Sequence, residues 1–339
     1  MAETEILAAA LIAFAVTGIS GKWIIPFLRR LHFGQTILED GPKWHKKKQG
    51  TPTMGGLMFI LGILVSALLC VPLYYRSAGG NSLGATESLP MRMKVFGGLG
   101  MALFFGAVGF FDDYIKVVKK RNLGLTARQK LVLQFLAAGA YLASLYFSGA
   151  GSATIIPFVG SVDLGAFYWL IALFVIVGVV NAVNFTDGID GLNASVTFFV
   201  GLSYLVIAGI LNLRGLGIVS AALAGGCLGF LFWNFNPAKV FMGDTGSLFL
   251  GGMVCALAFG MNVPVLLLPL GIVYLCEILS VVLQVSYFKA THGKRLFKMS
   301  PIHHHFEMCG WSEIKICLVF SAVTILGGAV SILCVVYGI

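Results

Sequence analysis

Five of the fourteen acidic residues stand in short motifs rich in glycine, asparagine or histidine. They are Asp112, Asp113, Asp187, Asp190 and Asp244. Carboxylate oxygens are hard ligands that suit Mg²⁺, and a positioned carboxylate can also accept a proton during a reaction. Because three separate segments carry these five residues, we expect the fold to bring the segments together in one shared site.

The segment Gly109-Phe-Phe-Asp-Asp-Tyr-Ile-Lys116 ends an apolar run and places two carboxylates next to each other. Adjacent residues point about 100° apart on a helix, so Asp112 and Asp113 cannot do identical jobs. Asp112 and Lys116 lie one turn apart and share a face. An acidic pair that only solvates a helix end is the alternative. Because aspartate at a helix C-terminus opposes the helix dipole, we expect a cation nearby, either Lys116 or a metal.

Two further polar segments join apolar runs. The segment Asn184-Phe-Thr-Asp-Gly-Ile-Asp-Gly191 gathers short polar side chains around two glycines, and ordinary turn or cap chemistry is the alternative to a functional role. The segment Gly243-Asp-Thr-Gly-Ser247 begins a predicted helix, where free N–H groups favour an anion. Asp244 offers oxygen to Mg²⁺, so this segment suits a metal-bound phosphate. A simple aspartate cap would explain Asp244 alone.

Three consecutive histidines, His303 to His305, follow a basic stretch. Neighbouring histidines are poorly arranged to bind one zinc ion together. We therefore expect hydrogen bonding or electrostatic support for phosphate oxygens, with a chance surface cluster as the alternative.

Other candidates lie in the first basic loop and within one apolar run. The basic residues around Lys48 suit an orientation signal, whereas the glycine-rich segment Thr51–Gly56 would let the backbone approach a ligand. Ionisable residues inside membranes are functional candidates. Here we assign Glu277 to packing or helix pairing and place Gln284 nearer the site.

The elements that must position these residues are membrane-spanning helices. The chain is 58% hydrophobic and 11% charged, against about 25% charged residues in soluble domains. A spanning helix needs about 20 apolar residues, and the apolar runs lack the alternation of barrel strands. They fall near 6–28, 54–75, 93–111, 131–149, 166–184, 194–213, 215–234, 246–262, 264–288 and 314–338. We predict an all-α integral membrane protein of about ten transmembrane helices, with residues 1–339 forming a single polytopic domain.

Two connections deserve a separate expectation. The eighth and ninth runs meet at Asn262-Val-Pro264 with almost no loop, and the segment Ala153–Asp163 suits a short hairpin. We expect no chemistry from the hairpin.

Lysine and arginine gather in the segments that follow the odd-numbered runs. The positive-inside bias places these segments in the cytoplasm and both termini outside, so the active-site cleft would open on the cytoplasmic side. The net charge of +9 then forms a one-sided basic field that suits membrane lipid headgroups or anionic substrates. Nucleic acid is a poor partner because these charges lie close to the membrane.

Five motifs resemble those of the polyprenyl-phosphate N-acetylhexosamine-1-phosphate transferases, and in particular the phospho-N-acetylmuramoyl-pentapeptide transferase branch. The motifs are Thr51-Pro-Thr-Met-Gly-Gly56, Asp112-Asp-Tyr-Ile-Lys116, Asn184-Phe-Thr-Asp-Gly-Ile-Asp-Gly191, Phe241-Met-Gly-Asp-Thr-Gly246 and Pro301-Ile-His-His-His-Phe-Glu307. The motifs are spread along the sequence, so the resemblance covers nearly the whole chain, and the last motif is typical of the muramoyl branch.

The resemblance implies ten helices in a bacterial plasma (inner) membrane. It also implies transfer of phospho-MurNAc-pentapeptide from UDP-MurNAc-pentapeptide to undecaprenyl phosphate, which gives lipid I and UMP with Mg²⁺ as cofactor. Asp244 matches the family's Mg²⁺ ligand, and Asp112, Asp113, Lys130 and His303 match its essential polar set. Positions lining the nucleotide-sugar pocket match Lys48, Asn184, Asp187, Asp190, Asn234, Phe241, Gln284 and His304. Thr53 and Gly243 join the substrate-binding candidates.

The chemistry agrees with that reaction. A lipid phosphate must meet a diphosphate, and a divalent cation with Lys116, Lys120 and Lys130 would offset the repulsion between them. Asp112 could remove the acceptor's proton before direct attack, or a covalent phospho-aspartate could form. A sister transferase that uses UDP-GlcNAc is the near alternative. A secondary transporter is the distant one, although transporters place polar residues near the midplane. The sequence leaves the oligomeric state open, a homodimer included.

Overall fold

The computed structural model describes residues 2–31, 48–79, 89–118 and 124–339. Within these ranges ten helices are long and apolar enough to cross a membrane. They are α1 (Ala2–Arg30), α2 (Gly56–Gly79), α3 (Leu89–Val118), α4 (Ala127–Phe147), α5 (Ala166–Phe185), α6 (Leu192–Ile210), α7 (Arg214–Asn234), α8 (Gly243–Gly260), α10 (Ile272–Ala290) and α12 (Glu313–Gly338). Each contains most of one predicted run, so the prediction of an all-α membrane protein with ten spans is confirmed.

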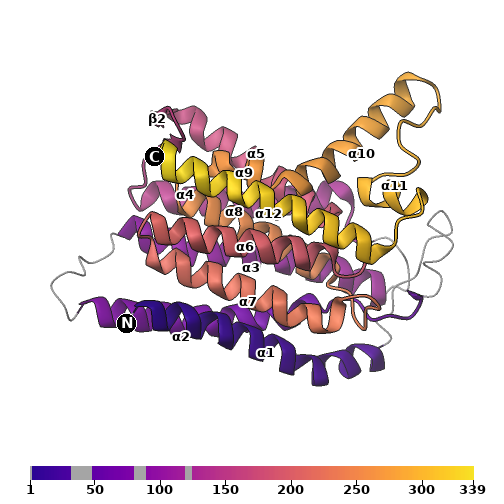
Figure 1. The fold of residues 1–339 in the computed structure, drawn as a ribbon, viewed down its shortest axis with the longest axis horizontal. Coiled ribbons are helices and arrows are strands. Elements are labelled where there is room, and N and C mark those ends of the chain that lie inside the picture. Colours follow the sequence, from indigo (N-terminus) through magenta and orange to yellow (C-terminus); the bar gives the residue numbers. More distant parts are fainter. Residues whose placement is uncertain (1, 32–47, 80–88, 119–123) are drawn as a thin grey trace.

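The long helices lie side by side in one bundle, with both chain termini at the same end (Figure 1). α1 runs from the N-terminus to the opposite end, and α12 returns with the C-terminus. At that opposite end α10 leans away from the bundle, and the short helix α11 (Ile302–Met308) packs against α10 and α12. The end of α3 that carries the two adjacent aspartates lies at the bundle end opposite both termini.

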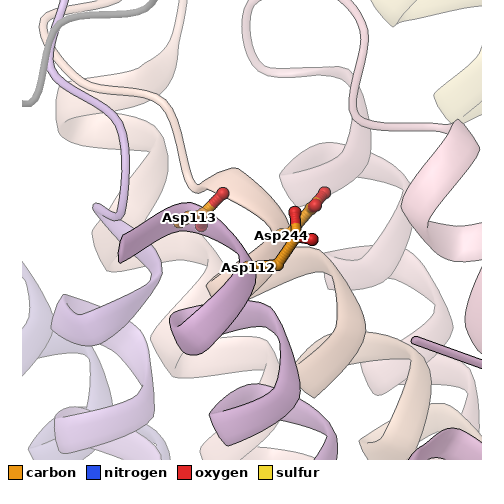
Figure 2. A group of neighbouring side chains, drawn as sticks. All are labelled: Asp112, Asp113 and Asp244. Atoms are coloured by element: carbon orange, nitrogen blue, oxygen red, sulfur yellow. The ribbon is translucent and has the colours of Figure 1, made fainter. Parts of the chain in front are cut away.

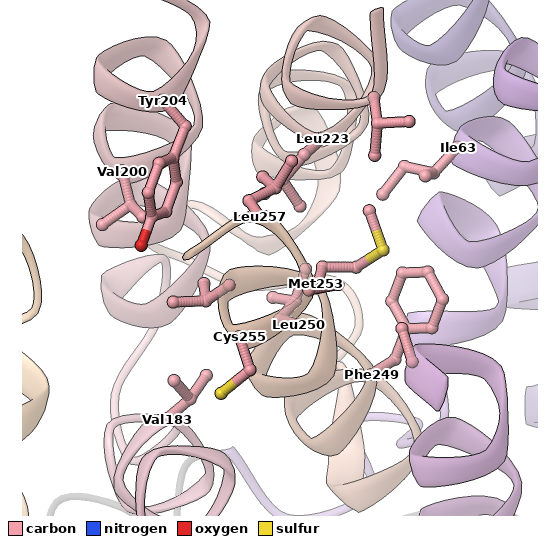
Figure 3. Packing of buried hydrophobic residues seen from close by; sticks show 14 of the residues in the cluster. Ile63, Val183, Val200, Tyr204, Leu223, Phe249, Leu250, Met253, Cys255 and Leu257 are labelled. Carbon is pink, nitrogen blue, oxygen red and sulfur yellow. The ribbon is translucent and has the colours of Figure 1, made fainter. Parts of the chain in front are cut away.

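Helix α8 is the centre of the bundle. Most of its side chains are buried by other helices. It packs along α3, and its side chains also lie among those of α2, α5, α6 and α7 (Figure 3). Its glycines permit backbones to come close: a Cβ on Gly252 would lie 2.7 Å from Cα of Ala102 in α3, and one on Gly251 would lie 2.7 Å from Cα of Val180 in α5. Such close approach favours helix association in lipid, where the hydrophobic effect between helices is weak.

The ninth apolar run is not one continuous helix, contrary to the predicted span 264–288. It begins with a 3₁₀ turn η2 (Pro264–Leu266), continues as α9 (Leu267–Leu270), and restarts as α10 after Gly271. A Cβ at Gly271 would lie 2.6 Å from the carbonyl oxygen of Leu267, so the break depends on glycine. The eighth and ninth runs are nevertheless distinct, because α8 ends at Gly260.

The segment 153–163 forms the expected hairpin. Strands β1 (Ala153–Ile156) and β2 (Gly160–Asp163) pair antiparallel, with Ala153 opposite Asp163. Backbone N–H groups of Ile155 and Phe158 donate to the carbonyl oxygens of Asn262 (3.0 Å) and Gly338 (2.8 Å). The hairpin therefore covers the bundle end that carries the C-terminus.

Candidate active site

Asp112 lies buried in the last turns of α3, where it binds a lysine of its own helix. Its Oδ2 is 2.6 Å from Nζ of Lys116, one turn onward. Its Oδ1 accepts a 2.8 Å hydrogen bond from the backbone N–H of Leu125, just before α4. The predicted shared face is therefore present, and Lys116 is one cation beside Asp112.

Asp244, in the first turn of α8, is contacted by side chains from three other helices. Its Oδ2 lies 2.9 Å from Nζ of Lys116 and 3.0 Å from Nζ of Lys130, in α4. Its Oδ1 accepts a 2.8 Å hydrogen bond from Asn184 at the end of α5. Asn184 also reaches Oγ of Ser247, one turn into α8 (2.7 Å). Four helix ends thus meet at one carboxylate.

Asp113 has a different task from its neighbour, as its direction on the helix requires. Its Oδ2 accepts hydrogen bonds from both the N–H (2.9 Å) and the Oγ1 (2.8 Å) of Thr245. Asp113 therefore caps the start of α8 from another helix, and its negative charge lies where the dipole favours it. Gly243 has a φ of +70°, and a Cβ there would lie 2.5 Å from Asp113 Oδ2 and 2.7 Å from Oγ1 of Thr53.

The three aspartates form a compact group of oxygen ligands. One carboxylate oxygen from each of Asp112, Asp113 and Asp244 lies within 4.8 Å of the others, and Figure 2 shows the three side chains together at the ends of α3 and α8. Hard oxygen donors at this spacing suit a divalent cation such as Mg²⁺.

A second polar cluster joins three segments distant in sequence. Nζ of Lys48 lies 2.7 Å from Oδ1 of Asp190 and 2.6 Å from Oε2 of Glu313, at the start of α12. The other oxygen of Asp190 accepts hydrogen bonds from Asn236 (3.2 Å) and from the backbone N–H of Ala238 (2.9 Å). A cavity of about 460 Å³ opens beside this cluster, with Glu313, Asn236 and residues of the segment 310–314 in its wall.

The side chain of Asn234 is engaged by the backbone. It accepts from the N–H of Gly191 (3.2 Å) and donates to the carbonyl of Val240 (2.9 Å). Asn234 thus holds the turn after α5 against the segment before α8.

The glycine-rich segment 51–56 lies against the protein's own backbone. The N–H groups of Gly55 and Gly56 donate to the carbonyls of Phe241 (2.8 Å) and Met242 (3.1 Å), and Phe241 N–H donates to Pro52 (2.8 Å). A Cβ on Gly56 would collide with the backbone of Gly246. The close approach that we expected toward a ligand is therefore toward the start of α8.

The three histidines have three different partners. Nδ1 of His303 lies 3.0 Å from Oε2 of Glu277, and Nδ1 of His304 lies 2.6 Å from Oε2 of Glu307. His305 accepts a 3.2 Å hydrogen bond from the N–H of Lys298. Glu277, which we assigned to packing or helix pairing, joins α10 to α11 through a histidine among the active-site candidates.

Gln284 is nearer this end of the bundle, but its amide binds the loop before α11. Its Oε1 accepts from the N–H groups of Leu296 (3.1 Å) and Phe297 (2.8 Å), and its Nε2 donates to the carbonyl of Phe297 (3.2 Å). Lys120, the remaining lysine candidate, lies outside the described residues.

Asp187 lies in the turn between α5 and α6. Desolvation raises the pKa of its carboxyl well above the usual value, and the charges of Asp244, Asp113 and Asp190 add to the shift. Asp187 therefore lies within electrostatic reach of three of the other four aspartates singled out by their motifs.

Sequence reasoning missed Glu313, Thr245, Ser247 and Asn236. Thr245 and Ser247 lie inside the motif that carries Asp244, so their hydroxyls were visible as cap candidates. The only local signal for Glu313 is its place directly after Ser312, whose Oγ accepts from Lys315 N–H as an N-cap. Such a position reads as ordinary helix capping.

Comparison with known proteins shows that the chain is similar to glycosyl transferases. Residues 95–262 match the family described as Glycosyl transferase family 4, and residues 48–60 match phospho-N-acetylmuramoyl-pentapeptide-transferase signature 1. Proteins named phospho-N-acetylmuramoyl-pentapeptide-transferase are similar over nearly the full chain. The one from Listeria welshimeri is 45% identical over 96% of this chain and 97% of its own length. Those from Caldanaerobacter subterraneus and Clostridium perfringens are each 46% identical over 96% of this chain, and over 98% and 95% of their own lengths. The chain belongs to the phospho-N-acetylmuramoyl-pentapeptide-transferase family.

Proposed function

We propose that the protein transfers phospho-MurNAc-pentapeptide from UDP-MurNAc-pentapeptide to undecaprenyl phosphate, with lipid I and UMP as products. The observation that carries this proposal is the 44–46% identity to transferases of that name over 96% of the chain. The aspartate and lysine cluster at four helix ends supports it, because phosphoryl transfer requires little covalent chemistry from a protein beyond positioning and charge stabilisation.

The cluster is proposed to face the cytoplasm of a bacterium, from a multi-pass protein of the inner membrane. Lysine and arginine are concentrated in the segments that follow odd-numbered spans, and such segments remain in the cytoplasm. Both termini lie at the other end of the bundle (Figure 1). In this orientation the water-soluble donor and the membrane-bound acceptor can meet at one edge of the bilayer, which shortens the search between them.

Mg²⁺ is the cofactor that the oxygen ligands fit. Asp244 is the proposed ligand, and Asp112 and Asp113 contribute oxygens within 4.8 Å of its own. The ion would polarise a phosphoryl oxygen and stabilise charge on the leaving UMP. Lys116 and Lys130 lie beside the group and offset part of its negative charge.

The chain's own residues then have separable tasks. Lys116 and Lys130 present positive charge beside Asp244, where it would attract the donor's diphosphate and the acceptor's phosphate. Asp112 would take the acceptor's proton in a one-step transfer or form a phospho-aspartate in a two-step one. Its Oδ2 lies 2.6 Å from the Lys116 ammonium, so the two side chains form an ion pair at the place where the acceptor's phosphate would bind.

The donor pocket is proposed to extend from this cluster along the turn after α5. Its wall would include the residues that the family resemblance assigns to the nucleotide-sugar, together with the two further substrate-binding candidates Thr53 and Gly243. The residues assigned by the resemblance are Lys48, Asn184, Asp187, Asp190, Asn234, Phe241, Gln284 and His304. Several of these side chains bind one another or the backbone. They would therefore shape the pocket as well as contact the donor.

The test is release of UMP by purified protein supplied with undecaprenyl phosphate and a sugar nucleotide. We expect release with UDP-MurNAc-pentapeptide, loss on chelation of divalent cations, and recovery when Mg²⁺ is restored. Release from UDP-GlcNAc, but not from the muramoyl donor, would contradict the proposal and favour the sister transferase. Asp244→Asn is the matched variant for the Mg²⁺ dependence, because it keeps the size of the side chain and removes the charge of the proposed ligand.

A further inference from the structure

Glu277 and His303 form a fully buried pair between α10 and α11. Both side chains are 0% exposed, and Nδ1 of His303 lies 3.0 Å from Oε2 of Glu277. An ionised carboxylate only accepts hydrogen bonds. With Glu277 ionised, the ring hydrogen therefore resides on Nδ1, and Nε2 is the atom left for another partner.

The Nε2 edge of the His303 ring faces the turn between α5 and α6. A Cβ on Gly188 would collide with Nε2 and lie 2.5 Å from Cε1, so the ring packs directly on the glycine. Among the described residues Nε2 has no hydrogen-bond partner, and neither has Oε1 of Glu277. Buried polar atoms are nearly always paired, so two unpaired atoms in one residue pair indicate a role beyond packing.

The turn that His303 contacts is continuous with the aspartate cluster. Asn184, four residues before Gly188, donates to Oδ1 of Asp244 at 2.8 Å. The backbone N–H of Asp187 returns to the carbonyl of Asn184 at 3.2 Å. The unpaired nitrogen of His303 therefore lies against Gly188, in the same turn as Asn184, and Asn184 contacts Asp244.

We propose that Glu277 is a positioning residue that holds His303 so that Nε2 is offered to the donor's diphosphate at the turn after α5. This inference rests on the proposed function, in which the donor pocket extends from the aspartate cluster along that turn. A phosphate oxygen needs a hydrogen-bond donor, so Nε2 serves it with the ring protonated, and Glu277 supplies the counter-charge. Because Gly188 covers Nε2, binding of the donor must separate the turn from the ring.

The test is a double-mutant cycle on Glu277 and His303, measured as kcat and donor KM for UMP release. We expect Glu277→Gln to lower kcat about 10- to 100-fold, the range found for carboxylates that orient metal-bound histidines. His303→Asn should cause at least the same loss. In the His303→Asn background, Glu277→Gln should change kcat less than twofold, because residues that act through one another are not additive.

Ser280→Ala is the matched control for a buried polar residue of the same helix. Ser280 is buried and its hydroxyl donates to the carbonyl of Glu277 at 2.7 Å, so this variant disturbs α10 and leaves the carboxylate in place. We expect wild-type kcat. If Glu277→Gln does not fold, as judged by its thermal unfolding in detergent, Glu277→Asp replaces it in the cycle.

Three outcomes would overturn the inference. Losses from the two substitutions that multiply would show that Glu277 acts independently of His303. Wild-type kcat in Glu277→Gln would show that the carboxylate is dispensable. A wild-type protein that releases no UMP would remove the proposed function and this inference with it, whereas the first two outcomes leave the proposed function intact.

Discussion

Lys116 lies 2.9 Å from Asp244 although 128 residues separate them in the sequence. The same ammonium group lies 2.6 Å from Asp112 and 3.7 Å from Asp113. One lysine at the end of α3 therefore lies within ion-pair distance of three carboxylates and offsets part of their charge. Removing one partner from a buried charge cluster costs more than the pair contributes when intact, because the remaining charges are left uncompensated.

Lys116→Met should lower kcat/KM for UMP release by about 10²- to 10³-fold, the loss typical of removing one preorganised charge-stabilising group. Methionine keeps the length of the side chain and removes the charge. Lys239→Met is the control, since Lys239 also follows an odd-numbered span but lies over the ring of Trp233 at 5.3 Å. Wild-type kcat/KM in Lys116→Met would contradict the role we give to Lys116.

Asp112→Asn should impair the enzyme most at about pH 6 and least at about pH 9 if Asp112 takes a proton from the acceptor. A phosphate monoester has its second pKa near 6, so the acceptor is already dianionic at the higher pH and needs no base. The measurement is the ratio of wild-type to variant kcat at each pH. An equal ratio at both values would count against Asp112 as a base.

Glu313→Gln should raise the donor KM about fivefold and change kcat less. Glu313 lies 2.6 Å from Lys48 and accepts the backbone N–H of Asp190 at 3.0 Å. Glutamine can still accept hydrogen bonds, so the loss is that of one partly exposed ion pair, worth up to about 1 kcal/mol, which is about fivefold in an equilibrium constant. The measurement is a titration of UMP release against the donor concentration. A lowered kcat at unchanged KM would place Glu313 in the chemical step instead.

Gly188→Ala should destabilise the protein by about 1–3 kcal/mol, the usual cost of forcing extra volume into a packed site. The added methyl would collide with the His303 ring, and Gly188 is absent from the residues with positive φ, so the loss is steric. Gly178→Ala is the control in α5. Nothing lies within 4 Å of a Cβ there, and alanine should stabilise that helix by about 0.5–1 kcal/mol. Thermal unfolding in detergent measures both changes, and equal effects would contradict this account.

The sequence predicted the spans well because hydropathy reports the helix–lipid boundary directly. It did not predict the break at Gly271, because Pro264–Ala290 is apolar on both sides of that glycine. A continuous helix and an interrupted one can have the same apolar composition. The hairpin at 153–163 was predictable from its turn residues. Hydropathy also gave no sign that α8 would be surrounded by other helices.

The site was predictable where partners are close in sequence. Asp112 and Lys116 are four residues apart, so helix geometry alone predicted their contact. Glu277 and His303 are 26 residues apart. A single glutamate in an apolar run gives no indication of which side chain on a neighbouring helix it will contact. The pairing of Lys48 with Glu313, 265 residues apart, had no local signal of any kind.

The burial of α8 separates the helix that carries Asp244 from direct contact with lipid. A change in bilayer thickness or lipid composition acts on the helices that touch lipid, by altering their tilt. Most of α8 is enclosed by its neighbours, and its first turn carries Asp244. The helix that carries the carboxylate at the centre of the proposed reaction is thus shielded by its neighbours from direct contact with lipid.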